Sequence, residues 1–268
     1  MRNGLFWLVF PLMGMAQDLS QELENAEPPY IDQIYEKALL SYVEGNYEKS
    51  LQYIRHVIKS NFNDYRLRLL AGYNHWHLGN VVPATIHLLE LEKINKEEPL
   101  SYSEPAALYL SQNEIKKAEK ILLKGLDQLE VKNKVSPRMY NLLARALLLQ
   151  GREGEALRYI EKAKAVFKSG EHQLRDRVES LSLEGWIYAL RGQYDKALFV
   201  LEWAADQEKQ DPYLYNLLGQ IYWLWAENLP REEANEMRAK ARTAWQNALA
   251  LNAPPELKEL IQKKLNSP

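Results

Sequence analysis

The sequence predicts an all-α protein made of about six stacked helix-turn-helix hairpins and closed by a C-terminal helix. Three observations support this fold class: a period of 34 residues, small residues that recur within the helices, and glycine or asparagine that recurs at the turns. A fixed period of about 20 to 50 residues is typical of repeat proteins, in which each unit buries its apolar face only against its neighbours.

The period is set by the turn residues. Gly45, Gly79 and Asn113 are each 34 positions apart, whereas Gly151 follows after 38 positions and Gly192 after 41. The later connections therefore contain four and seven additional residues. A left-handed backbone at the end of a helix is most favourable for glycine and next most favourable for asparagine. We expect these five residues to end the first helix of each hairpin.

Small residues recur at two further positions of the hairpins. One lies mid-way along the first helix, and the other lies in the second helix and faces the first. A minimal side chain at these positions lets the two helix axes approach closely. The first set is Ala38, Gly72, Ala106, Ala144, Gly185 and Gly219, and the second set is Ser50, Ala84, Ala118, Ala156 and Ala197.

The ends of the units carry helix start and stop signals. Ser136-Pro137 and Asp211-Pro212 place a capping side chain before a proline at the first helical position. Pro254-Pro255 breaks the chain before a polar helix, expected over Glu256 to Leu265, which caps the stack. The predicted units lie near 31–64, 65–98, 99–132, 137–170, 178–211 and 212–252, and 253–268 forms the capping helix and tail.

The N-terminus predicts an exported protein. Arg2 precedes an apolar stretch at 5–15, and Gly14 and Ala16 are small residues at the two positions that a signal peptidase reads. Residues 1–16 are therefore a predicted signal peptide, and residues 17–30 a polar linker. The apolar stretch is shorter than the about 20 residues that span a bilayer. We expect a periplasmic chain without stable membrane insertion; secretion and N-terminal anchoring are the alternatives.

Composition excludes several function classes. The chain has 268 residues, of which 46% are hydrophobic and 26% charged, which is ordinary for a globular protein. Its formal net charge of -2 gives no general attraction to nucleic acid. It has no cysteine, which removes disulfides, thiolate metal sites and cysteine nucleophiles.

The repeated pattern resembles the tetratricopeptide repeat. The match is clearest between Gly185 and Ala204, where Tyr188, Gly192, Tyr194, Ala197 and Leu201 also stand at the spacings of the family. The resemblance extends over residues 31–252. It departs from the family at Ile115, where an aromatic residue is usual, and at Ala226, which is followed by about ten additional residues.

The resemblance implies a right-handed superhelical solenoid whose first helices line a concave groove that binds a partner polypeptide. The groove-facing positions of the family correspond in part to Leu39, Leu110, Leu148 and Gln220 in this sequence. The predicted partner-binding residues are Tyr35, Tyr42, Leu69, Tyr73, Trp76, Arg138, Asn141, Arg145, Trp186, Tyr213, Asn216 and Trp223.

Two assignments within this groove have alternatives. Tyr73 and Trp76 either lie on the groove surface or belong to the core. Arg145 either binds a carboxylate or backbone carbonyl groups of a ligand, or pairs with Glu179 on the next first helix. The carboxylate clamp of the best-known subfamily is absent, because its positions are occupied here by Tyr35, Leu39, Leu70, Leu100 and Glu104.

No catalytic, metal or cofactor site is predicted. His75 and His77 are two residues apart and point to different faces of a helix, and the other histidines, His56, His87 and His172, show no zinc-protease spacing. There is no glycine-rich phosphate loop, and adjacent acidic pairs such as Glu97-Glu98 and Glu232-Glu233 cannot converge across a cleft. The sequence argues against an enzyme.

The predicted function is that of a non-enzymatic scaffold or adaptor that binds a protein or peptide partner in the groove. Export favours a role in assembling or stabilising a cell-envelope complex. The alternatives are a structural protein whose groove is filled by its own copies, which makes it a homo-oligomer, and a recruiting module for a separate enzyme.

Overall fold

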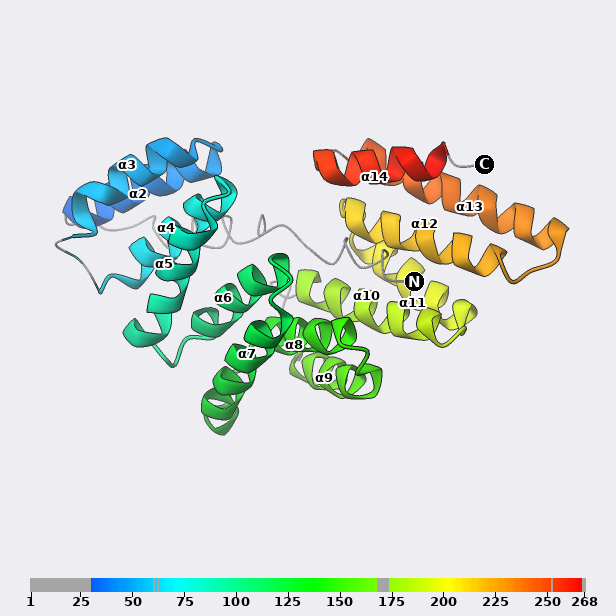
Figure 1. Ribbon diagram of the computed structural model, residues 1–268, viewed down its shortest axis with the longest axis horizontal. Helices are drawn as coiled ribbons and strands as arrows, with labels where there is room; N and C mark the ends of the chain where they lie inside the picture. The colour runs from blue at the N-terminus through cyan, green and yellow to red at the C-terminus, as the bar shows by residue number, and fades with distance from the viewer. Residues whose placement is uncertain (1–29, 60, 62, 168–173, 252, 267–268) are drawn as a thin grey trace. The chain divides into compact units, whose positions relative to one another are not determined.

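The computed structural model describes residues 30–59, 61, 63–167, 174–251 and 253–266. Thirteen α-helices and one short 3-10 helix lie in this part of the chain, and it contains no strand (Figure 1). The all-α fold class is therefore confirmed. The predicted signal peptide, the linker as far as residue 29 and the inserted residues around Gly170 lie outside the described residues.

The described helices form two compact units, which divide between Leu142 and Leu143 within one helix, α8 (Pro137–Leu149). Successive helices pair as antiparallel hairpins in each unit. The fifth hairpin begins at Leu174, four residues before the predicted start of the fifth unit near 178. The other elements of the first unit are α2 (Tyr30–Val43), α3 (Tyr47–Val57), α4 (Tyr65–His77), α5 (Val81–Ile94), α6 (Leu100–Ser111), α7 (Ile115–Leu129) and η3 (Glu130–Lys132). Those of the second are α9 (Glu153–Val166), α10 (Leu174–Leu190), α11 (Tyr194–Gln207), α12 (Pro212–Ala226), α13 (Arg231–Ala250) and α14 (Pro255–Leu265).

The turns inside the first five hairpins have the predicted left-handed backbone. The φ angle is 79° at Gly45, 73° at Gly79, 74° at Gly151 and 70° at Gly192. Asn113 has a φ of 61° at the equivalent position of the third hairpin. The prediction that asparagine replaces glycine at this turn for a conformational reason is therefore confirmed.

The small residues of the first helices allow close packing on the second helices. A Cβ atom at Gly219 of α12 would lie 2.4 Å from Nε1 of Trp245 on α13. A Cβ atom at Gly185 of α10 would lie 2.7 Å from Cγ of Leu201 on α11. Both distances are shorter than a normal carbon contact, so these helix pairs depend on glycine at these positions.

Each unit has its own apolar core. In the first unit, Leu51 and Ile54 of α3 pack with Leu67 and Leu70 of α4. In the second unit, α14 closes the last hairpin, because its buried residues Leu257 and Ile261 join the cluster around Trp245. No helix in the described part of the chain is long and apolar enough to cross a bilayer.

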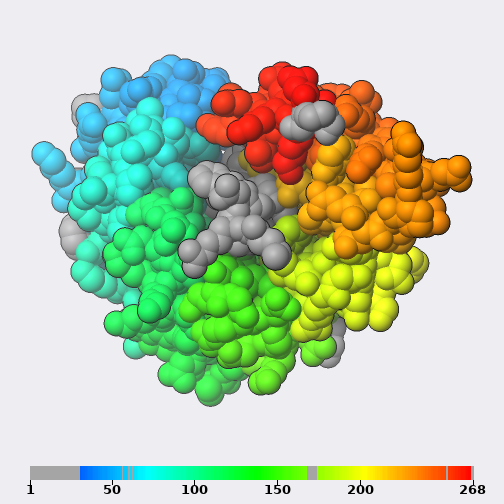
Figure 2. Space-filling view, turned by 45° about the vertical axis from the view of Figure 1, so that its right-hand side comes forward, coloured from blue at the N-terminus to red at the C-terminus, as the bar shows by residue number. Residues whose placement is uncertain are grey.

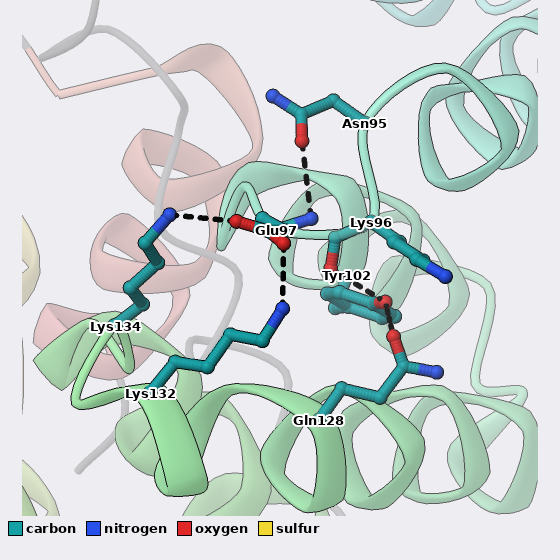
Figure 3. A network of polar contacts seen from close by, with 7 residues as sticks. All are labelled: Asn95, Lys96, Glu97, Tyr102, Gln128, Lys132 and Lys134. Atoms are coloured by element: carbon teal, nitrogen blue, oxygen red, sulfur yellow. Dashed lines mark hydrogen bonds and ion pairs between the residues drawn. The ribbon is translucent and has the colours of Figure 1, made fainter.

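Polar contacts connect the linker between α5 and α6 with the segment that follows α7 (Figure 3). Glu97 accepts hydrogen bonds from Nζ of Lys132 at 2.5 Å and from Nζ of Lys134 at 2.9 Å. These two lysines lower the pKa of Glu97 to about 2. The hydroxyl of Tyr102 in α6 donates to Oε1 of Gln128 in α7 at 2.6 Å. The bonds of Glu97 hold the linker that precedes the third hairpin against the end of that hairpin.

Candidate functional site

The twelve predicted groove residues are largely covered in the structure, and none of them is fully exposed. The seven that are buried are Tyr35, Leu69, Tyr73, Asn141, Arg145, Trp186 and Asn216. The five that are half-buried are Tyr42, Trp76, Arg138, Tyr213 and Trp223.

Charged pairs join consecutive first helices at the spacing of the repeat. Arg66 of α4 donates to Asp32 of α2, with 2.6 Å between Nη2 and Oδ1, and these residues are 34 positions apart. The guanidinium carbon of Arg66 also lies 5.1 Å from the ring centroid of Tyr35. Burial raises the pKa of Tyr35 to about 12, although the charge of Arg66 opposes this shift. Tyr35 is thus part of the packing between α2 and α4.

The same arrangement recurs further along the first unit, around Glu104. Glu104 of α6 is fully buried and accepts a hydrogen bond from Nε of Arg138 at 3.0 Å, again across 34 positions. Tyr73 of α4 also bonds to Glu104, and its ring stacks on that of Tyr42, with 6.2 Å between the centroids. Burial is the main cause that raises the pKa of Tyr73 well above its usual value. Sequence reasoning did not select Glu104, although its distance of 34 residues from Arg138 was a usable signal.

The structure places Tyr73 in the core. Tyr73 belongs to a buried cluster that includes Leu69, Leu88 and Leu108, and Trp76 packs against the same cluster while remaining half-exposed. Of the two alternatives for this aromatic pair, the core position applies to Tyr73, because its side chain is only 3% exposed and lies in this cluster. An extended patch of exposed aromatic residues is therefore not present at this point.

In the second unit, Arg145 and Glu179 form the expected ion pair. Nη2 of Arg145 donates to Oε1 of Glu179, and both side chains are buried. Their carboxylate and guanidinium groups neutralise one another between α8 and α10. A buried pair of this kind is costly to break, because removing one partner leaves an uncompensated charge.

One face of α12 carries Tyr213, Asn216, Gln220 and Trp223, which are spaced three, four and three residues apart. The two aromatic residues at its ends pack against the cluster formed by α13 and α14. The ring of Trp223 lies 5.7 Å from that of Trp245, between their centroids. Burial raises the pKa of Tyr213 to about 12. The ends of this face are therefore anchored by apolar packing.

Three polar atoms of the two amides between these aromatic residues lack hydrogen-bond partners among the described residues. Asn216 is fully buried, yet neither its Oδ1 nor its Nδ2 atom has a partner within the described residues. Nε2 of Gln220, one helical turn further on, is likewise buried and without a partner there. A buried polar group that makes no hydrogen bond costs about 1–3 kcal/mol. The α12 amide pair, Asn216 and Gln220, thus destabilises the fold locally.

Comparison with protein families assigns the repeats. Residues 136–207, which comprise the fourth and fifth hairpins, match the tetratricopeptide repeat model. The chain contains tetratricopeptide repeats. No curated protein sequence matches the chain.

Solved structures with similar folds include two that are named as tetratricopeptide-repeat proteins. A chain of the APC/C hetero-tetramer Cut9-Hcn1 is 12% identical, with a TM-score of 0.70 over all of this chain and 46% of that one. A repeat protein of Parabacteroides merdae is 14% identical, with a TM-score of 0.57 over 88% and 99% of the two chains. A thermophilic repeat protein of Thermus thermophilus is 18% identical, with a TM-score of 0.54 over 69% and 94%. The chain spans about half of the first of these, and identities this low show the fold alone.

The tetratricopeptide-repeat fold is suited to binding proteins, because stacked helices present long faces of side chains. In the described part of the chain, no group of three or more histidine, aspartate or glutamate residues could hold a metal ion. His75 and His87 stack with 5.6 Å between ring centroids, and Arg68 lies 3.3 Å from Nδ1 of His87. A cationic guanidinium next to the histidine nitrogen disfavours a metal ion there.

Proposed function

We propose that this tetratricopeptide-repeat chain is an exported, non-enzymatic scaffold that binds a partner polypeptide through the first-helix face of α12 and supports assembly of a cell-envelope complex. The observation that carries the binding part is the α12 amide pair, whose buried polar atoms lack partners. Natural proteins keep such costly groups where function requires them.

An extended polypeptide backbone is the ligand that fits these groups. A side-chain amide offers both a donor and an acceptor, which matches the N–H and C=O groups of a peptide bond. Asn216 and Gln220 are four residues apart, which corresponds to about 6 Å along a helix. Alternate residues of an extended strand are about 6.6 Å apart, so the two amides can bind every second peptide unit of one strand.

The aromatic ends of this face define how a ligand enters. Tyr213 and Trp223 are half-buried on either side of the amides. Because Asn216 is fully covered, the side chains around it have to move before a strand can reach its amide. We therefore expect association to be slower than for a preformed open groove, as is usual when binding requires a conformational change.

Peptide selection on the purified mature chain tests the binding proposal. Unstructured random peptides are displayed, and the best binders are resynthesised with single N-methyl groups on successive backbone amides. We expect methylation at two alternate positions to reduce affinity at least about tenfold, since each removes a hydrogen-bond donor. An Asn216→Leu variant is expected to lose affinity to a similar extent, whereas Asn247→Leu, at an exposed position of α13, is the matched control.

The binding proposal is wrong if selected peptides bind Asn216→Leu as well as the unmodified chain. It is also wrong if affinity depends on peptide side chains while N-methylation has no effect. Either result would assign binding to another surface.

The export part is supported by the N-terminal sequence, with its apolar stretch and small residues at 14 and 16. It predicts a mature chain that begins at Gln17. Intact-mass measurement of the chain recovered from the envelope fraction of its cells tests this start. Recovery of the full-length mass from the cytosol would contradict export.

A further inference from the structure

The face of α2 that carries Leu40 is exposed, whereas the equivalent face of the first helix in the later hairpins is buried. Leu40 of α2 is 61% exposed, whereas the residues 34 and 68 positions further on, Asn74 and Leu108, are 0% and 1% exposed. Val43, one turn beyond Leu40, is 58% exposed. A position that is buried in the interior of the stack is therefore open at its N-terminal end.

The later hairpins show what normally covers this face. Asn74 of α4 donates from Nδ2 to Oγ of Ser50 on α3, at 2.9 Å. Leu67 and Leu70 of α4 pack in the same direction, against Leu51 and Ile54 of α3. In the interior of the unit, this face thus accepts a helix of the preceding hairpin. In α2, which lies in the blue first hairpin of Figure 2, the equivalent residue Leu40 remains 61% exposed among the described residues.

The charges on this face are self-complementary. Lys37 and Leu40 of α2 are followed at helical spacing by Glu44, the first residue after α2, whose backbone N–H donates to the C=O of Leu40 at 3.0 Å. The three residues therefore form one stripe at this end of the helix. The order along the stripe is positive, apolar and negative. When two such stripes run antiparallel about a two-fold axis near Leu40, each lysine faces a glutamate and the two leucines meet in the centre.

We propose that α2 pairs with α2 of a second copy, so that the chain forms an antiparallel, isologous dimer through its first helix. Leu40 and Val43 form the apolar centre of this interface, and Lys37 faces the partner's Glu44 on both sides. Because only one helix face from each copy is buried, the interface is small and formation of the dimer depends on the protein concentration. This dimer is independent of the proposed binding of a polypeptide by α12, and it leaves that face unchanged.

Sedimentation velocity of the mature chain, at concentrations from about 1 to about 500 μM, tests the interface. We expect the mass to double over this range. Leu40→Glu is expected to remain monomeric at all these concentrations, because it places two carboxylates at the centre of the interface. Val82→Glu on α5, at a position that is 68% exposed, is the control and should dimerise like the unmodified chain. Circular dichroism checks that each variant is folded.

Charge reversal tests the antiparallel register separately. Lys37→Glu or Glu44→Lys alone places like charges opposite one another and should weaken the dimer, whereas the double variant restores opposite charges and should recover it. A monomeric chain at every concentration overturns the proposal and leaves α2 open to a helix of another protein. Dimers that resist Leu40→Glu, or a double variant no better than the single ones, also overturn it. Peptide binding by α12 is measured independently, so its failure can be told apart from failure of the dimer.

Discussion

Glu104 is a buried carboxylate held between helices by Arg138, Ser103 and Tyr73. The charge of Arg138 compensates that of Glu104, and the two hydroxyl groups satisfy further lone pairs of its carboxylate. Arg138 therefore binds a residue of the neighbouring repeat. A residue that family positions place in the groove can thus also join neighbouring repeats.

His87 makes the stability of the first unit depend on pH. Its pKa is lowered to about 4 by burial and, to a smaller extent, by the neighbouring charges of Arg68 and His75, with Glu90 opposing them. The unfolded chain has the ordinary histidine pKa of about 6.5, so it binds a proton in the window from about 6.5 to 4 that the folded chain does not. We therefore expect the free energy of unfolding to fall as the pH is lowered through this window.

Urea unfolding at a series of pH values measures this effect, with His87→Gln as the comparison. The variant should show a smaller loss of stability between about pH 6.5 and 4, because one proton-linked group has been removed. His75 and His77 also have lowered pKa values, so part of the slope should remain. Parallel profiles for the two proteins would show that His87 is not protonated on unfolding in this window.

Helical periodicity predicts which face of a helix a residue occupies, but it does not predict what covers that face. Tyr73 and Asn216 were both assigned to the first-helix face of their hairpins. Both are buried, yet Tyr73 is packed and hydrogen-bonded within its unit, whereas Asn216 has no partner among the described residues. This difference arises from neighbouring helices, which a single sequence does not specify.

At the scale of elements, sequence reasoning succeeds where one local conformation is required. The turns follow from the left-handed backbone at Gly45 and its equivalents, and the start of α12 follows from Asp211, whose carboxylate accepts from the backbone N–H of Tyr213 at 2.8 Å. α10 begins at Leu174, four residues before the approximate start of the fifth unit near 178, because the inserted residues before it have no counterpart in the regular period.

The contact between α12 and α13 is predicted to be intolerant of a single methyl group. Gly219→Ala would place Cβ 2.4 Å from Nε1 of Trp245, whose large ring is buried and cannot easily move. We expect the free energy of unfolding to fall by about 1–3 kcal/mol, as is usual for overpacked cores. Chemical denaturation monitored by tryptophan fluorescence measures this loss.

Gly154→Ala in α9 is the matched control, because no atom lies within 4 Å of the added Cβ there. Its stability should be unchanged or raised by up to about 1 kcal/mol, since alanine favours helix more than glycine does. Equal effects of the two substitutions would show that the close approach of α12 and α13 is not what requires Gly219.

For the whole molecule, the all-α tetratricopeptide-repeat architecture could be predicted from the sequence because its signals repeat. A recurring small residue, turn residue and apolar spacing support one another, so an irregular position such as Asn113 does not obscure the pattern. The candidate site is less predictable. It depends on one unsatisfied amide pair, Asn216 and Gln220, that only the packing of the second unit reveals.

The opposite effects of one substitution on stability and binding test the central claim most directly. Asn216→Leu keeps the number and branching of the side-chain heavy atoms and removes two buried polar atoms that lack partners. If the amide is retained to bind a polypeptide, this variant should unfold with a free energy about 1–3 kcal/mol higher than the unmodified chain while its peptide affinity falls at least about tenfold. A variant that is less stable and binds peptides as well as before would show that Asn216 serves the fold, and would contradict the account.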